Sequence, residues 1–218
     1  MTAHFVQLLD DLQRRSLRMA SLVEDVVQEA CEAALGADAK LARRVIRRDN
    51  EVDAEEVEIE AETVRLMALY QPVGSDLRLL CTVLKVNNVL ERIADCAVNI
   101  AERAAHLDHQ SVNNQVNAVR QMAGIVQHML RAAIQAYGDQ NAEDGQNVLS
   151  EDDAVDTTYA QIIRSVVADA AGGPDAMAAY LDILSIAKNL ERIADHATNI
   201  AEDVVYLSTG EIVRHQQR

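Results

Sequence analysis

The chain has 218 residues and a net charge of −15, and 49% of its residues are hydrophobic but only 3% aromatic. So acidic a chain repels nucleic acid and anionic membrane surfaces, which argues against both as general partners, and it attracts cations. The shortage of aromatic residues, with 2 Pro and 8 Gly, favours a helical core of aliphatic side chains over a sheet. No apolar run has the length of a signal segment or a membrane span, and three scattered cysteines are typical of free thiols, so we expect a cytoplasmic protein that does not insert into a membrane.

Six segments carry apolar side chains at helical spacing. Pro72 and Gly74 separate the second segment from the third, and the sequence AGGPD at Ala171–Asp175 separates the fifth from the sixth. A short polar tail follows the sixth. The expected helices span, in chain order, about residues 5–35, 38–69, 76–106, 119–137, 148–167 and 176–207.

The second half of the chain repeats the first. The phrase LERIADCAVNIAE at Leu90–Glu102 recurs as LERIADHATNIAE at Leu190–Glu202, and the helices before it match at a shift of 103 positions. Each half therefore holds three helices in the same order, and three amphipathic helices with short connections bury their apolar stripes best as a bundle. We predict an all-α fold of two tandem three-helix bundles, residues 1–108 and 109–218, related by a pseudo-twofold axis.

Pairs of carboxylates four residues apart occur in both halves. Side chains at this spacing lie side by side on a helix, about 6 Å apart, and a like-charged pair there destabilises an isolated helix. If the second and third helices of each half are neighbours, two pairs face each other across a groove and four carboxylates converge. Carboxylate oxygens are ligands of Mg²⁺, Ca²⁺, Mn²⁺ and iron. The candidate metal ligands are Asp49, Asp53, Glu91 and Asp95 in the first half and Asp152, Asp156, Glu191 and Asp195 in the second, and Asn99, Glu102, Asn199 and Glu202 continue the same face.

A solvated acidic face is the alternative interpretation of these pairs. The acids of the third helix point away from its apolar stripe, so that any metal there lies at the surface. Asp152 and Asp156 instead interrupt an apolar stripe of the fifth helix, where a charge is costly unless it is paired or metal-bound. That stripe consists of Leu149, Tyr159, Ile163 and Val167. The spacing alone leaves both interpretations open.

Common enzyme motifs are absent from the sequence. There is no GxxxxGK[ST], GxGxxG, HExxH, GxSxG or CxxC, and no Glu stands three residues before a histidine, as a ferritin-like di-metal bundle requires. We therefore expect a protein without catalytic activity. A metal-dependent enzyme on a helical scaffold, such as a phosphatase, and a purely structural bundle with a solvated acidic face are the alternatives.

Several motifs together resemble one known family. They are QPVGSDLR at Gln71–Arg78, the two copies of the LERIAD phrase, and the Asp pairs of the second and fifth helices, in matching order over about residues 4–207. This combination resembles the PhoU family, the accessory regulators of bacterial phosphate uptake. In Ala94 and Ala194 the chain departs from the glycine that is frequent in the family, but all the acids stay in place.

The resemblance implies two pseudo-symmetric three-helix bundles, dimers, and surface metal clusters on the eight carboxylates named above. It also implies a negative regulator that links the ATPase of the phosphate ABC transporter to a sensor histidine kinase. Such a regulator keeps phosphate-starvation genes silent while phosphate is plentiful.

Overall fold

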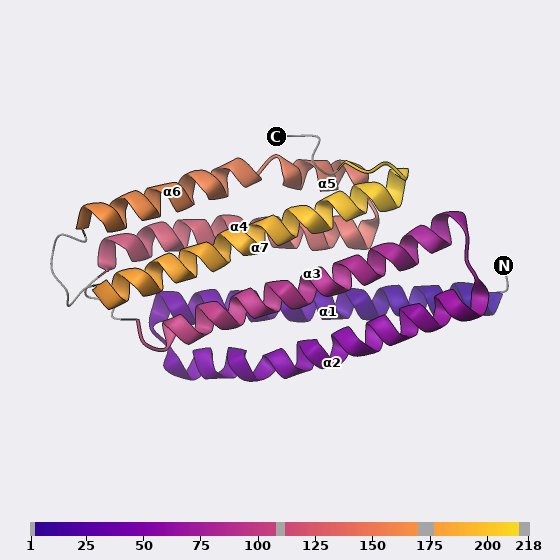
Figure 1. The fold of residues 1–218 in the computed structure, drawn as a ribbon, viewed down its shortest axis with the longest axis horizontal. Coiled ribbons are helices and arrows are strands. Elements are labelled where there is room, and N and C mark those ends of the chain that lie inside the picture. Colours follow the sequence, from indigo (N-terminus) through magenta and orange to yellow (C-terminus); the bar gives the residue numbers. More distant parts are fainter. Residues whose placement is uncertain (1–2, 108–111, 170–176, 214–218) are drawn as a thin grey trace.

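The computed structural model describes residues 3–107, 112–169 and 177–213, and these residues form helices but no strand. In Figure 1 the helices of the first half lie beside those of the second half in one elongated molecule. The predicted fold of two three-helix bundles is confirmed. The predicted boundary between residues 108 and 109 and the break at Ala171–Asp175 lie outside the described residues. The described helices are α1 (Ala3–Gly36), α2 (Ala39–Tyr70), α3 (Gly74–Ala104), α4 (Asn113–Asp139), α5 (Ala142–Leu149), α6 (Asp152–Asp169) and α7 (Met177–Thr209).

Local sequence sets the ends of α2. The side chain of Asp38 accepts hydrogen bonds from the amides of Lys40 and Leu41 at 2.9 and 3.0 Å, which satisfies two free N–H groups of the first turn. At the other end Gln71 adopts a left-handed conformation and closes the helix on the carbonyl of Met67. Gly74 begins α3 with a φ of 61°, a conformation that glycine adopts without a steric cost.

The core is built from aliphatic stripes at helical spacing. Side chains seven residues apart on α2, namely Val45, Val52, Ile59 and Leu66, are all fully buried. The predicted seam of α3 is buried as well, and it consists of Leu90, Ile93, Ala97, Ile100 and Ala104. Each fully buried Val, Leu or Ile side chain contributes roughly 1.5–3 kcal/mol relative to an exposed one. The aliphatic core predicted from composition is therefore present in the fold.

The predicted fifth helix over residues 148–167 is wrong in one respect, because the chain breaks it in two. The amide and the hydroxyl of Ser150 both donate to the carbonyl of Asn147, at 3.1 and 2.6 Å, and this tight turn ends α5. A new helix, α6, then begins at Asp152, where Asp152 and Asp153 in the first turn interact favourably with the positive end of the helix dipole. In the second bundle α5 and α6 together correspond to α2.

The predicted apolar stripe of this segment is wrong in its second half, although Leu149 and Tyr159 are partly buried against the core. The buried side chains of α6 are Val155, Ile162 and Val166, whereas Ile163 and Val167 are 37% and 70% exposed. The buried side chains Val148, Val155 and Ile162 are seven residues apart, so the buried side keeps one helical phase across the break and lies beside Ile163 and Val167. Asp152 is half-buried and Asp156 is exposed, so neither interrupts a fully buried stripe.

The two bundles meet along α3 and α7, which lie against each other and run in opposite directions (Figure 1). Lys85 on α3 lies 3.1 Å from Asp203 on α7, and Arg103 lies 3.8 Å from Asp182. Behind them α1 meets α4, where the hydroxyls of Ser16 and Tyr137 share a buried hydrogen bond of 3.0 Å. Within the described residues, none of the helices is both long enough and apolar enough to cross a membrane.

Candidate functional site

Four predicted acids meet where α2 packs along α3, and we call them the first carboxylate cluster: Asp49, Asp53, Glu91 and Asp95. Burial raises the pKa of the Asp49 carboxyl, and the charges of Asp53 and Asp95 raise it further. Asp53 belongs to the same helix as Asp49, but Asp95 belongs to α3. The acids of the two helices therefore act on each other across the groove, as the sequence predicted for neighbouring helices.

Glu91 is a half-buried carboxylate of this cluster, with 26% of its side chain exposed. Its Oε2 atom is buried and accepts no hydrogen bond, although the guanidinium of Arg92 lies 3.3 Å away. Burial raises the pKa of Glu91, Asp95 raises it further, and Arg92 opposes the shift. A buried carboxylate oxygen without a hydrogen bond costs free energy, so this atom is a ready acceptor for a cation.

Sequence reasoning missed a fifth acid of this groove. Glu56 lies three residues after Asp53, on the same side of α2, and its charge also raises the pKa of Glu91. Its backbone carbonyl accepts a hydrogen bond of 2.9 Å from the side chain of Asn87, which is 1% exposed. Asn87 therefore ties α2 to α3 next to the cluster. The spacing of Glu56 was visible in the sequence, but the partner of Asn87 was not.

The second carboxylate cluster has the same arrangement on α6 and α7, with Asp152, Asp156, Glu191 and Asp195. Burial raises the pKa of Asp152, and the charges of Asp156, Asp153 and Glu191 add to the shift. Burial likewise raises the pKa of Asp195, with further contributions from Glu191 and Asp152. The structure thus brings together all eight predicted acids as two matched groups of four.

A lysine distinguishes the second cluster from the first. The ammonium of Lys188 lies 2.7 and 2.5 Å from the two carboxylate oxygens of Glu191, and 5.6 Å from the centre of the Tyr159 ring. This charge opposes the rise in the pKa of Asp195. The equivalent position of the first half, 100 residues earlier, holds the neutral and exposed Asn88. Lys188 stands three residues before Glu191, a helical ion-pair spacing that the sequence already showed.

The four additional residues predicted for the same face differ in exposure, and for them metal binding stays a prediction. Asn99 and Glu102 are exposed, and Asn199 and Glu202 are half-buried. Neither glutamate is among the charges that shift the pKa of a cluster acid. They lie one and two helical turns beyond the four-residue motif, which places them past the crossing acids of the neighbouring helix.

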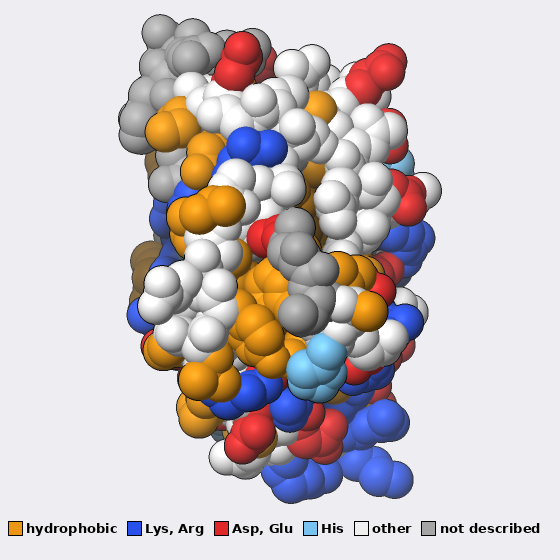
Figure 2. Space-filling model, turned by 90° about the vertical axis from the view of Figure 1, so that its right-hand side faces the viewer, with side chains coloured by type: hydrophobic (Ala, Val, Ile, Leu, Met, Phe, Trp, Pro, Cys, Tyr) orange, Lys and Arg blue, Asp and Glu red, His pale blue; other side chains and the backbone are white. Residues whose placement is uncertain are grey.

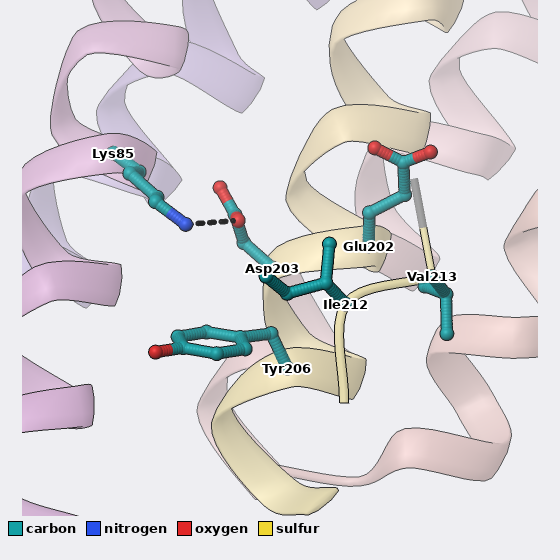
Figure 3. Close-up of a pocket in the computed structure, with 6 residues that line it drawn as sticks. All are labelled: Lys85, Glu202, Asp203, Tyr206, Ile212 and Val213. Carbon is teal, nitrogen blue, oxygen red and sulfur yellow. Dashed lines mark hydrogen bonds and ion pairs between the residues drawn. The ribbon is translucent and has the colours of Figure 1, made fainter. Parts of the chain in front are cut away.

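Glu202 instead lines a small cavity between the two bundles (Figure 3). The cavity has a volume of about 110 Å³, and the ammonium of Lys85 reaches into it from α3 to pair with Asp203. Lys85 also lies 4.8 Å from the centre of the Tyr206 ring. Space of this size holds a few water molecules at about 30 Å³ each. The ion pair between Lys85 and Asp203 connects the two bundles at this cavity.

The clusters offer the chemistry of a hard cation site without a closed coordination sphere. In the parts of the chain that the structure describes, no three His, Cys, Asp or Glu side chains surround one point closely enough to hold a metal ion. The donors are carboxylate oxygens, which suit Mg²⁺, Ca²⁺, Mn²⁺ or iron. Asp53 is exposed and free to change rotamer, so the residues of the first cluster fit a metal after side-chain movement.

Comparison with known proteins gives one consistent result. The PhoU domain profile matches residues 16–104 and 119–204. A phosphate-specific transport system accessory protein PhoU homolog from Pseudomonas aeruginosa is 38% identical over 95% of this chain and 86% of its own length. A homolog of the same name from Caulobacter vibrioides is 35% identical over 100% of this chain and 96% of its own length.

Solved structures agree with the sequence comparisons. The crystal structure of PhoU from Pseudomonas aeruginosa superimposes with a TM-score of 0.91 at 36% identity, over 95% of this chain and 100% of that one. The phosphate transport system regulatory protein PhoU from Streptococcus pneumoniae gives a TM-score of 0.89 at 27% identity, over 96% and 99% of the two chains. Domain profile, fold and near-complete sequence coverage agree, and the chain belongs to the PhoU family.

Proposed function

We propose that this chain is an accessory protein of a phosphate-specific transport system. The observation that carries this proposal is similarity over nearly the whole chain to relatives that bear this name. Because both bundles and both carboxylate clusters are included in the match, the proposal does not depend on one shared motif.

In this role the chain acts as an adaptor and a negative regulator. It contacts the ATPase of the phosphate ABC transporter and a sensor histidine kinase, and it restrains uptake and phosphate-starvation signalling while phosphate is plentiful. It works in the cytoplasm as a homodimer, and its three free cysteines suit a reducing compartment. It does so without catalysis, in keeping with relatives named as accessory proteins.

Metal binding at the first carboxylate cluster is part of the proposal. A divalent or iron-type cation on Asp49, Asp53, Glu91 and Asp95 would offset their mutual repulsion and hold α2 against α3. It would also give the buried Oε2 atom of Glu91, which accepts no hydrogen bond, a second cationic neighbour besides Arg92. The role of the metal is then to set the shape and the charge of a docking face.

Co-purification under two phosphate conditions tests the adaptor role. Tagged chain is captured from cells grown with high or low phosphate, and the transporter ATPase and the kinase are detected with specific antibodies. We expect both proteins to be captured, in amounts that differ between the two conditions. Failure to capture either protein in either condition contradicts the proposal.

A phosphatase assay separates an adaptor from a metal-dependent enzyme. Purified chain loaded with Mn²⁺ is compared with the variant Glu91→Ala, Asp95→Ala on a general phosphomonoester substrate. An adaptor gives no turnover above that of the variant. Turnover by the wild-type chain that the variant lacks would replace the adaptor role with an enzymatic one.

A further inference from the structure

Helix α2 carries a second apolar stripe on the side that faces solvent. Its side chains are separated by three and four residues in alternation, and all are exposed, including Val57 at 61% and Val64 at 51%. A rotation of about 100° per residue places this outer stripe opposite the buried stripe that contains Ile59. The outer stripe consists of Ala54, Val57, Ala61, Val64 and Ala68.

The alternating spacing is that of a seam between two packed helices. On the inner side of α2 such a seam is covered by α1 and α3. On the outer side no element of the described part of the chain packs against the stripe. Figure 1 shows α2 along the outer edge of the first bundle. At the end of the molecule where α2 ends, hydrophobic side chains also gather on the surface (Figure 2), and Leu69 and Val73 are 64% and 78% exposed.

The rim of the outer stripe is strongly acidic. Between Glu51 and Tyr70 the chain has seven acids and one base, Arg65. The Nε and Nη2 atoms of Arg65 already donate hydrogen bonds to the carboxylate of Glu62, at 2.7 and 2.6 Å. Two exposed acids directly flank the stripe. Glu58 has a distant partner in Arg15 at 3.7 Å, and Glu60 has no ion-pair partner among the described residues.

The outer stripe is a property of the first half and not of the fold. At the equivalent positions of α6, 103 residues later, the chain has Thr157, Ala160, Arg164 and Val167. A hydroxyl and a guanidinium there interrupt the apolar pattern, although α6 belongs to a bundle of the same architecture. The three-helix bundle therefore does not require an apolar outer face on this helix.

We propose that the outer stripe of α2 is a docking surface for a basic amphipathic helix of a partner protein. The apolar side of such a helix would pack on Val57 and Val64, and its flanking Lys or Arg side chains would pair with Glu58 and Glu60. Local charge decides against a second copy of this chain as the occupant of this surface, because two copies would place their acidic rims against each other. The inference uses no carboxylate-cluster residue and stands apart from the proposed role in phosphate transport.

A designed peptide tests this surface on the full chain. The probe is a fluorescent helical peptide of about 20 residues with Leu at the seam positions and Lys at the flanking positions, and its binding is followed by anisotropy. The variant Val57→Glu, Val64→Glu places two charges in the stripe, and we expect it to lower the affinity at least about tenfold. The matched control on α6 is Ala160→Glu, Val167→Glu, which should bind like the wild type. A thermal melt of each variant checks that the fold is kept.

Charge reversal gives the sharper result. The variant Glu58→Lys, Glu60→Lys should no longer bind the Lys peptide. It should instead bind a peptide that has Glu at the flanking positions. The proposal is overturned if the wild-type chain does not bind the Lys peptide, if both glutamate variants lose binding equally, or if charge reversal leaves the preference unchanged. It is overturned in favour of a second copy if light scattering shows a dimer that the substitutions at Val57 and Val64 dissociate.

Discussion

The two carboxylate clusters have the same backbone plan but a different charge balance. In the first cluster Asp49, Asp53, Glu91 and Asp95 share their groove with a fifth acid and the neutral Asn88. In the second cluster Lys188 places an ammonium 2.5 Å from Glu191 and supplies a cation from within the chain. The acids are thus the same in both halves, while the position three residues before the motif places a lysine beside the second cluster only.

The helix break at Ser150–Glu151 adds to this difference. Asp152 stands at the start of α6, where the helix dipole favours a negative charge, whereas its counterpart Asp49 lies inside the long helix α2. The second cluster thus has two internal sources of positive potential, and the first has only the partial compensation by Arg92. We infer that the first cluster is the stronger metal site.

Exchanging the residue three positions before Glu91 or Glu191 is expected to have the largest effect on the difference in metal affinity between the clusters. The variant Asn88→Lys should weaken Mn²⁺ binding at the first cluster by at least about tenfold, because it supplies the ammonium that the second cluster already has. The variant Lys188→Asn should create binding at the second cluster. Calorimetric titration of both variants measures the change, and equal affinities in wild type and Asn88→Lys would contradict it.

Asn87 is the next point at which the halves differ, because its equivalent in the second half is Ala187. The variant Asn87→Ala removes the buried hydrogen bond to the carbonyl of Glu56 and leaves that carbonyl without its side-chain donor. We expect the free energy of unfolding in urea to fall by about 1–2 kcal/mol. The exposed substitution Asn88→Ala serves as the control and should change it by less than about 0.5 kcal/mol.

Lys188 should also contribute to stability when no metal is present. With a chelator, Lys188→Met is expected to lower the free energy of unfolding by about 0.5–1 kcal/mol, a modest value because half of the lysine side chain is exposed. Under the same conditions Asn88→Lys should raise it by a similar amount. Chemical denaturation measures the free energy of unfolding of both variants. Values equal to that of the wild type in both would contradict a stabilising role of the lysine.

The pH dependence of stability gives the smallest expected effect. Burial raises the pKa of Asp49 and Glu91, so just above their ordinary pKa values the folded chain binds more protons than the unfolded chain. Their contribution therefore stabilises the fold as the pH falls through the raised pKa values, and destabilises it as the pH rises.

The variant Asp49→Asn, Glu91→Gln tests this sign. With a chelator at neutral pH it should be more stable than the wild type by up to about 1 kcal/mol, and this advantage should shrink as the pH is lowered. Urea unfolding at a series of pH values measures the difference. The matched variant Asp152→Asn, Glu191→Gln should show a smaller gain, because it also removes the partner of Lys188.

Much of the fold could be predicted because its determinants are local. The seven-residue spacing of Val45, Val52, Ile59 and Leu66 identifies the buried side of α2 in the sequence, and the duplicated phrase at Leu90 and Leu190 identifies the two bundles. The break before α6 was not predicted, because it depends on the hydrogen bonds that the amide and the hydroxyl of Ser150 donate to the carbonyl of Asn147. Sequence periodicity does not distinguish a continuous helix from two helices joined by a tight turn.

The candidate site, like the fold, has features that the sequence predicts within one helix and contacts between helices that it does not predict. The pairs with i,i+4 spacing predict which acids share a helix face, and neighbouring helices then bring them together. The hydrogen bond from Asn87 to α2 is a contact between helices, so no pattern within one helix indicates it. Helical phase also grouped Glu102 and Glu202 with the clusters, but neither is among the charges that shift the pKa of a cluster acid.

The number of metal ions bound per chain tests the central claim most directly. Equilibrium dialysis against Mn²⁺ with elemental analysis is carried out on the wild-type chain, on Asp53→Asn, Glu91→Gln, and on Asp156→Asn, Glu191→Gln. The account predicts that the wild type and the second-half variant retain metal while the first-half variant loses it. Equal loss in both variants would contradict the difference between the clusters, and a wild-type chain without metal would identify both as solvated acidic faces.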